Sequence, residues 1–311
     1  MLSRSLILLV SSRPWFERFI RNSRITQPVV RRFIAGNKRE DAIRSAEELV
    51  KKGFTASLDY LGEHTTRHEE AEAAFQEYMH LVEDIARSPY GGGSAPEKIN
   101  VSVKLSQLGH DFEEAETKRR LITLLDVAAR NGNFIRIDME SSPTVERTLR
   151  LVREVWPERK NVGVVLQAML HRTKQDIEEM IGMGIRVRLV KGAYLEPPEV
   201  ALQKKRDVDA AYLEYAKKLL SKGNFPAIAT HDERIIEQVI GYCAKNNIGK
   251  EKFEFQMLFG VKRKLQAELV EKGYNLRIYI PYGMSWYPYF VRRLAERPAN
   301  LWFFIRSLFG K

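Results

Sequence analysis

Three strand-like runs of this sequence each contain a charged residue among apolar ones. Lys104, Asp138 and Arg188 each stand within a short run of valine, isoleucine or leucine. A charge inside an apolar strand costs free energy unless it is paired or binds a ligand. One such ion can be a structural salt bridge, but three on different strands favour a binding site. The excess of Lys and Arg predicts an anionic ligand group, a phosphate or a carboxylate.

A second charged cluster lies close to the C-terminus. Arg292 and Arg293 precede Glu296 by four and three residues, so on a helix the three side chains can meet. Aromatic residues stand beside them: Trp286, Tyr287, Tyr289 and Phe290. The pattern is compatible with a solvated ion-pair face, or with an arginine clamp that binds a small carboxylate beside a closed apolar pocket.

The chain that carries these residues alternates short β-like runs with longer helical segments. The predicted strands cover residues 56–61, 99–105, 134–139, 162–167, 186–190, 227–230, 253–257 and 277–281. The predicted helices cover residues 37–52, 68–86, 115–131, 143–156, 173–183, 209–221, 234–246 and 262–272. Eight strand-then-helix units in 311 residues predict an α/β fold, a (βα)8 TIM-like barrel with additional N-terminal helices and a C-terminal helix over the barrel mouth. A doubly wound open sheet is the alternative, but no G-x-G-x-x-G turn follows the first strand.

A barrel of this kind predicts where the polar residues meet. Active sites of such barrels form at the C-terminal ends of the strands. The polar residues near those ends are Asp59, Glu63, Lys104, Ser106, Asp138, Glu140, Gln167, Arg188, Lys191, Thr230, His231, Glu254, Gln256, Tyr279 and Tyr282. We expect residues 37–311 to form the barrel and residues 1–36 to form an N-terminal amphipathic helical arm.

The arm and the net charge indicate the partners. The chain has a net charge of +11, and seven arginines fall within its first 32 residues, between apolar residues. No apolar run reaches the roughly 18 residues that a spanning helix needs. The arm therefore docks on the barrel or lies on a membrane surface. The single cysteine, Cys243, favours a packing role and a reducing compartment. We expect a cytoplasmic protein, with peripheral contact at the inner face of the cell membrane as an open alternative.

Two other classes of function fit less well. A metal-dependent barrel hydrolase often needs a His-x-His pair, and none of the six histidines forms one, so we expect no metal. A scaffold that binds nucleic acid or a membrane fits the positive charge but leaves the ions within the strands unexplained. We therefore expect no nucleic-acid partner.

Six short motifs occur in order along the barrel. They are Val103–Ser106, Ile137–Glu140, Arg188–Tyr194, Thr230–His231, Phe253–Gly260 and Tyr289–Glu296. Together they resemble the motifs of the proline dehydrogenase family, in its monofunctional bacterial FAD-dependent form, over roughly residues 40–305. Each motif alone is modest, but six in register are specific. One departure is Arg297–Pro298, where many relatives carry Asn–Gly, and this should alter the turn that ends the helix and not the arginine pair.

The resemblance implies a flavin-dependent reaction. It implies FAD as cofactor, L-proline as substrate and Δ1-pyrroline-5-carboxylate as product, in the first step of proline degradation to glutamate. A hydride would move from proline C5 to flavin N5, and a quinone would accept the electrons. A separate pyrroline-5-carboxylate dehydrogenase would act next. The alternative is a flavin barrel oxidoreductase for another small amino or imino acid.

The resemblance also implies a role for each matching residue. The catalytic residues would be Asp138 and Arg188. The substrate-binding residues would be Glu63, Lys104, Tyr279, Tyr289, Arg292, Arg293 and Glu296. Among these, Arg292 and Arg293 would hold the proline carboxylate, and Glu63 would pair with Arg292 as a gate. The FAD-binding residues would be Met139, Gln167, Arg188, Leu189, Val190, Lys191, Gly192, Ala193, Thr230 and His231.

Overall fold

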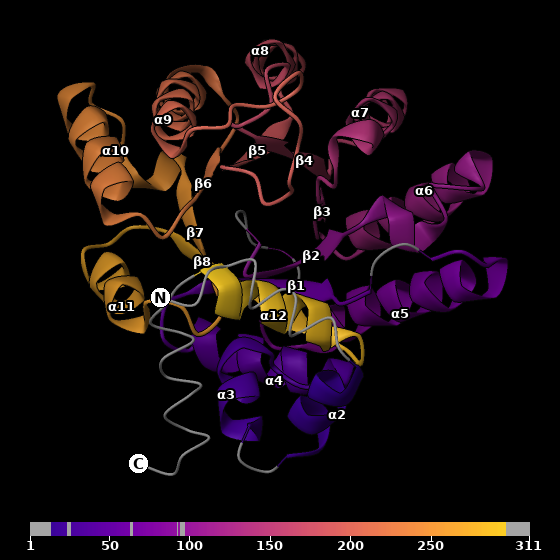
Figure 1. Ribbon diagram of the computed structural model, residues 1–311. Helices are drawn as coiled ribbons and strands as arrows, with labels where there is room; N and C mark the ends of the chain where they lie inside the picture. The colour runs from indigo at the N-terminus through magenta and orange to yellow at the C-terminus, as the bar shows by residue number, and fades with distance from the viewer. Residues whose placement is uncertain (1–13, 24–25, 63–64, 92, 94–96, 297–311) are drawn as a thin grey trace.

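Eight parallel strands close into a barrel in chain order (Figure 1). The computed structural model describes residues 14–23, 26–62, 65–91, 93 and 97–296. The strands are β1 (Thr55–Tyr60), β2 (Ile99–Val103), β3 (Ile135–Ile137), β4 (Val162–Gln167), β5 (Arg186–Val190), β6 (Ala227–Ala229), β7 (Glu254–Leu258) and β8 (Leu276–Tyr282). β1 pairs with both β2 and β8, which closes the sheet. The predicted (βα)8 fold is therefore confirmed.

A ring of helices surrounds the barrel (Figure 1). Its members are α4 (Arg39–Val50), α5 (His68–Arg87), α6 (Glu114–Arg130), α7 (Ser142–Val155), α8 (Thr173–Met183), α9 (Lys205–Lys222), α10 (Glu233–Lys245) and α11 (Arg263–Glu271). Two 3-10 helices, η1 (Leu105–Leu108) and η2 (Lys250–Lys252), lie in connections. The side chains of each strand alternate between the two faces of the sheet. Leu58, Val101 and Ile137 point outward and are fully buried in the core beneath the helices.

The alternate residues of the strands point into the barrel, and many of them are polar. Ser57, Ser102 and Arg188 come from three different strands, and their side chains are in hydrogen-bond contact. The interior is therefore not a purely aliphatic core. Its polar side chains need partners or a ligand, because an unpaired buried polar group is costly.

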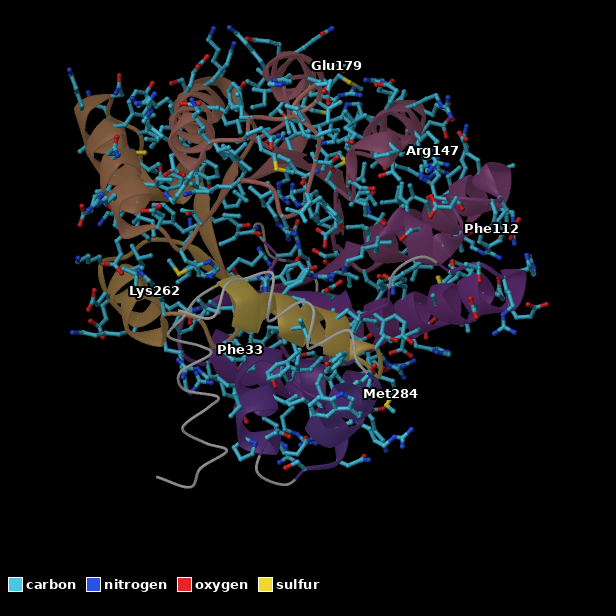
Figure 2. All side chains as sticks on the ribbon, viewed as in Figure 1. Phe33, Phe112, Arg147, Glu179, Lys262 and Met284 are labelled. Carbon is cyan, nitrogen blue, oxygen red and sulfur yellow. The ribbon has the colours of Figure 1, made fainter. Side chains whose placement is uncertain are left out.

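Three helices lie outside the ring: α2 (Pro14–Asn22), α3 (Gln27–Phe33) and α12 (Trp286–Glu296). α12 lies across the barrel mouth, with α2 and α3 below it in the view of Figure 1. Ile20 of α2 and Phe33 of α3 join Trp286 and Phe290 of α12 in a second apolar cluster (Figure 2). The Phe33 and Phe290 ring centroids are 6.4 Å apart. The N-terminal helices therefore help to hold α12 in place. No described helix is both long and apolar enough to cross a membrane.

Candidate active site

A cavity of about 1210 Å3 opens at the carboxyl ends of the strands. The predicted site residues that line it are Lys104, Asp138, Met139, Gln167, Arg188, Val190, Lys191, Gly192, Ala193, Thr230, His231, Tyr279, Tyr289, Arg292 and Arg293. Leu189 does not line it, because its side chain points outward into the core beneath the helices. Glu63 and the side chain of Glu296 lie outside the described residues. The ends of all eight strands, or the loops that follow them, thus contribute side chains to the cavity. The residue from β1 is Asp59, which was not among the predicted site residues.

Asp138, Arg188 and Tyr279 form a hydrogen-bonded group in the wall of this cavity. Arg188 Nη1 donates to Asp138 Oδ1 at 2.7 Å, and the Tyr279 hydroxyl donates to Asp138 Oδ2 at 2.6 Å. The Arg188 guanidinium also lies 5.2 Å from the centroid of the Tyr279 ring. Burial, followed by the charges of Asp138 and Asp59, raises the pKa of Tyr279 well above its usual value. Tyr279 therefore remains a hydrogen-bond donor across the physiological pH range.

Two buried serines hold Arg188 from inside the barrel. Arg188 Nη2 donates to Ser102 Oγ at 3.0 Å and lies 3.4 Å from Ser57 Oγ, and the two hydroxyls are 3.0 Å apart. Among the described residues, Arg188 Nε is buried without a hydrogen-bond acceptor. Each Nη atom is thus fixed by the protein, while Nε remains a donor that a ligand can use.

Asp59 is the second-last residue of β1 and forms an ion pair with Lys104 beside this group. Lys104 Nζ donates to Asp59 Oδ1 at 2.5 Å, and both side chains are buried. The sequence interpretation placed Asp59 near the strand end but did not include it among the site residues. Its signal was the alternation of β1, which puts Asp59 on the same inner face as Ser57.

The loops after β4, β5 and β6 form the other side of the cavity. Lys191 Nζ bridges Asp209 at 2.5 Å and Asp232 at 3.1 Å. His231 Nε2 accepts a hydrogen bond from the Leu258 backbone N–H at 2.9 Å, so in the neutral ring its proton is on Nδ1. Asp209 and Asp232 were not predicted as site residues. Asp209 lies within the charged helical segment α9, and Asp232 precedes α10, where its residue type indicates the start of a helix.

Gly192 allows the backbone of the loop after β5 to adopt a conformation with positive φ. Its φ of +115° disfavours any residue with a side chain. A Cβ atom there would also lie 2.4 Å from the Met169 sulfur. Gly192 therefore allows the loop backbone to pass close to Met169 at the cavity wall.

α12 closes the cavity on the side opposite the loops. Tyr289, Arg292 and Arg293 all reach the cavity from this helix. Arg293 is buried, and its guanidinium lies 4.9 Å from the centroid of the Tyr289 ring. Arg293 is therefore not on a solvated face of α12. A second cavity of about 550 Å3 shares Tyr289 and Arg292 with the first and lies toward β1 and α5.

Comparison with known proteins agrees with this geometry. The family model "Proline dehydrogenase" matches residues 42–306. The chain is 37% identical over 281 residues to proline dehydrogenase 1 of Bacillus subtilis strain 168, covering 90% of this chain and 91% of the relative. It is also 37% identical over 315 residues to the proline dehydrogenase of Deinococcus radiodurans, covering 99% and 98%. The chain belongs to the proline dehydrogenase family.

Solved structures place the barrel in the same family. Proline utilization A from Bdellovibrio bacteriovorus, solved after inactivation by N-propargylglycine, superposes with a TM-score of 0.80 at 29% identity. The match covers 92% of this chain and 34% of that longer protein. The family is that of an enzyme, so the cavity of this proline dehydrogenase homologue is its candidate active site.

Glu254 is a polar strand residue that does not reach the candidate active site. It is the first residue of β7 and accepts two hydrogen bonds of 3.0 Å from Arg277 Nε at the amino ends of the strands. The next inward residue of the same strand, Gln256, lines the cavity. Glu254 and Gln256 point to the same face of β7, but only Gln256, which is closer to the carboxyl end of the strand, reaches the cavity.

Two further observations concern the single cysteine and the candidate metal ligands. Burial raises the pKa of the Cys243 thiol to about 11, which makes it a poor nucleophile and fits its predicted packing role. Within the described ranges, no three histidine, cysteine or carboxylate residues are grouped as metal ligands.

Proposed function

We propose that this protein oxidises L-proline to Δ1-pyrroline-5-carboxylate with bound FAD and passes the electrons to a quinone. The observation that carries the proposal is the position of Arg188 in the cavity wall, with a buried Nε donor that has no acceptor among the described residues. A flavin ring is rich in acceptor atoms and fits such a donor. Asp138 and the two serines fix the guanidinium before any ligand arrives.

The donor set of the cavity fits FAD as a whole. Positive side chains at the loops, Lys191, Lys205 and Lys262, suit the anionic diphosphate. Gln167, whose Nε2 donates to the Glu140 carbonyl at 2.9 Å, is held in place to contact a ring edge. The flavin, when bound, supplies the hydride acceptor. Arg188 supplies fixed positive charge where the flavin gains electrons.

The remaining groups of the cavity suit a small cyclic amino acid. Arg292, Arg293 and Lys104 provide three positive charges for one carboxylate. Tyr279 and Tyr289 provide ring faces for an apolar pyrrolidine ring. α12 covers the site and limits the access of water. We propose that Glu63 pairs with Arg292 and that Tyr289 limits substituents on the substrate ring.

The decisive test of the proposed function is spectroscopic. The purified protein should show a flavin absorption band that L-proline bleaches without oxygen, whereas D-proline and L-glutamate leave it unchanged. A flavin band that L-proline does not bleach would overturn the substrate and keep the cofactor. A colourless protein that cannot be reconstituted with FAD would overturn the proposed function altogether.

We also propose peripheral contact with an anionic membrane, where a quinone acceptor is found, through the N-terminal helices. Trp15 of α2 is 63% exposed and Arg18 is exposed on the same helix. Met284, labelled in Figure 2, is also exposed, and its carbonyl accepts a hydrogen bond of 3.0 Å from Arg21 of this helix. Exposed aromatic and basic side chains together favour a bilayer surface. Anionic vesicles should bind the protein at low salt and release it at high salt, and a lack of binding at low salt would contradict this.

A further inference from the structure

The two carboxylate oxygens of Asp59 differ in their hydrogen bonds. Asp59 is 1% exposed, and its Oδ1 accepts from Lys104 Nζ at 2.5 Å. Its Oδ2 is buried and receives no hydrogen bond of ordinary geometry from the described residues. The neighbouring Tyr279 hydroxyl donates to Asp138 instead. Lys104 is therefore the cation in direct contact with Asp59. The nearby Tyr279 hydroxyl also lowers the pKa of Asp59, although its hydrogen bond goes to Asp138.

Asp138 is better compensated than Asp59. Its two oxygens accept from Arg188 and Tyr279 respectively. The titratable or charged side chains around Asp59 are Lys104, Asp138, Arg188, Tyr279 and, from α5, Tyr78. Burial raises the pKa of Asp59 to about 6, because it outweighs the lowering by Lys104 and acts with the nearby charge of Asp138. Asp59 can therefore take up a proton near neutral pH.

We propose that Asp59 binds a proton when the substrate carboxylate engages Lys104. This inference rests on the proposed function, because it needs a carboxylate ligand in the cavity. A second carboxylate beside Lys104 competes with Asp59 for the ammonium charge and repels the charge of Asp59. Two carboxylates that share one site cannot both stay ionised without cost, and the less compensated one takes up a proton.

The reaction itself offers that proton. An amino acid with a secondary amine enters at neutral pH as an ammonium ion, and its nitrogen must lose one proton before its lone pair can form a C=N bond. Lys104 can give a proton to Asp59 and receive the one that the nitrogen releases, so Lys104 ends unchanged. Bound FAD would supply the acceptor for the hydride that leaves C5 as the C=N bond forms. Asp59 thus acts through Lys104 as a positioning residue that also stores the proton.

The test uses a ligand that has no nitrogen to supply the proton. Cyclopentanecarboxylate has the carboxylate and ring of proline, so any proton that Asp59 binds must come from solvent. Titration calorimetry of the FAD-loaded protein in buffers of different ionisation enthalpy gives the protons taken up per ligand. We expect more than about half a proton at pH 7, and an affinity that weakens as pH rises above about 6 by up to roughly tenfold per pH unit.

Three variants assign the effect. In Asp59→Asn the proton uptake should vanish, and the loss of affinity above about pH 6 that Asp59 causes should vanish with it, because a neutral amide cannot titrate. Lys104→Met should also abolish the uptake, even if Asp59→Asn does not fold. Asp176→Asn is the matched control. Asp176 is a buried carboxylate whose Oδ2 lies 2.8 Å from Arg172 Nε, and it does not line the cavity. Its uptake should equal that of the unaltered protein.

The outcomes separate this inference from the proposed function. If cyclopentanecarboxylate binds without proton uptake, or if Asp59→Asn retains the uptake, the inference is wrong and the proposed function stands. If L-proline bleaches the flavin and cyclopentanecarboxylate does not bind, the inference is also wrong, because it requires the carboxylate alone to engage Lys104. If neither ligand affects the protein, the proposed function fails and the inference fails with it.

Discussion

The two ends of the barrel interior both contain buried charges, but the hydrogen-bond partners of these charges differ. At the amino ends of the strands, Arg277 donates to Glu254 through Nε, to the Ala56 carbonyl at 2.8 Å and to the Glu97 carbonyl at 2.8 Å. At the carboxyl ends, Arg188 meets Asp138 and two serines and retains one donor for a ligand. The first arginine is saturated by the protein, whereas the second lines a cavity of about 1210 Å3.

At the amino ends of the strands, a second buried arginine packs against the backbone. Arg136 crosses the barrel there and donates to the carbonyls of Val164 and Arg186. A Cβ atom on Gly163 would lie 2.7 Å from Arg136 Nη1, so the missing side chain makes space for the guanidinium. Although burial alone raises the pKa of Glu254, Arg277 lowers it below its usual value and keeps the carboxylate charged. Arg277 at the strand starts is thus paired within the fold, whereas we propose that the ions at the strand ends serve the ligand.

The largest effect on stability should come from the amino end. Arg277→Met leaves Glu254 buried without its cation, which typically costs about 3–5 kcal/mol of unfolding free energy. Urea denaturation measures it. The double variant Arg277→Met/Glu254→Leu should recover part of the loss, because no charge then remains unpaired. A single variant as stable as the unaltered protein would contradict a structural role for this pair.

The clamp on α12 should show a smaller effect, on substrate binding. Arg293→Met removes a charge-assisted hydrogen bond worth about 1.5–3 kcal/mol, so the KM for L-proline should rise roughly 10- to 100-fold. The steady-state rate with an artificial electron acceptor gives the KM. Arg206→Met is the control, since its side chain is 91% exposed on α9. An unchanged KM in the Arg293 variant would exclude this arginine from the clamp.

The loop after β5 should be sensitive at one glycine. Gly192→Ala forces a side chain into a positive-φ conformation against Met169, at a cost of roughly 1–3 kcal/mol. FAD affinity, measured by flavin fluorescence during reconstitution, should weaken accordingly. Gly182→Ala on α8 is the matched control, because nothing lies within 4 Å of its Cβ position. Equal FAD affinity in both variants would show that the loop does not contact the cofactor.

The smallest effect should come from the solvent face. Lys118 and Glu154 pair at 2.7 Å, but each side chain is 42% exposed. Such a pair typically contributes less than about 1 kcal/mol. Lys118→Met should therefore barely change the urea midpoint, and a loss as large as that of Arg277→Met would undermine the contrast between buried and exposed pairs.

The strands could be predicted from the sequence because their apolar runs are distinct. The predicted strands 162–167 and 186–190 coincide with β4 and β5. The predicted strand 99–105 was too long, since the chain turns into η1 at Leu105 after β2 ends at Val103. Such a turn depends on tertiary contacts, here a hydrogen bond of 3.2 Å from the Ser106 backbone N–H to Glu140, which the local pattern does not encode.

The candidate site was predictable only in part. Lys104, Asp138 and Arg188 stood out as charges in apolar strands, and the six motifs supplied the remainder. Asp59 was missed because its partner, Lys104, is 45 residues away in the sequence. Glu254 was grouped with the strand-end residues because the alternation of side chains predicts which face of a strand a residue occupies, but not whether it lies at the amino or the carboxyl end of the barrel. Ion pairs across the barrel form only when the sheet closes, so a short stretch of sequence cannot predict them.

The most direct test of the contrast between the two barrel ends is the rate at which L-proline reduces bound FAD, measured by anaerobic rapid mixing in two matched variants. Arg188→Lys should slow the reduction by about 10^2- to 10^3-fold, because lysine keeps the positive charge but loses the guanidinium that Asp138 and the serines fix, together with its Nε donor. Arg277→Lys, measured where it remains folded and FAD-loaded, should stay within roughly threefold of the unaltered protein, since it lies far from the reacting groups. An equal loss in both variants, or a larger loss in Arg277→Lys, would contradict the assignment of function to the carboxyl ends of the strands.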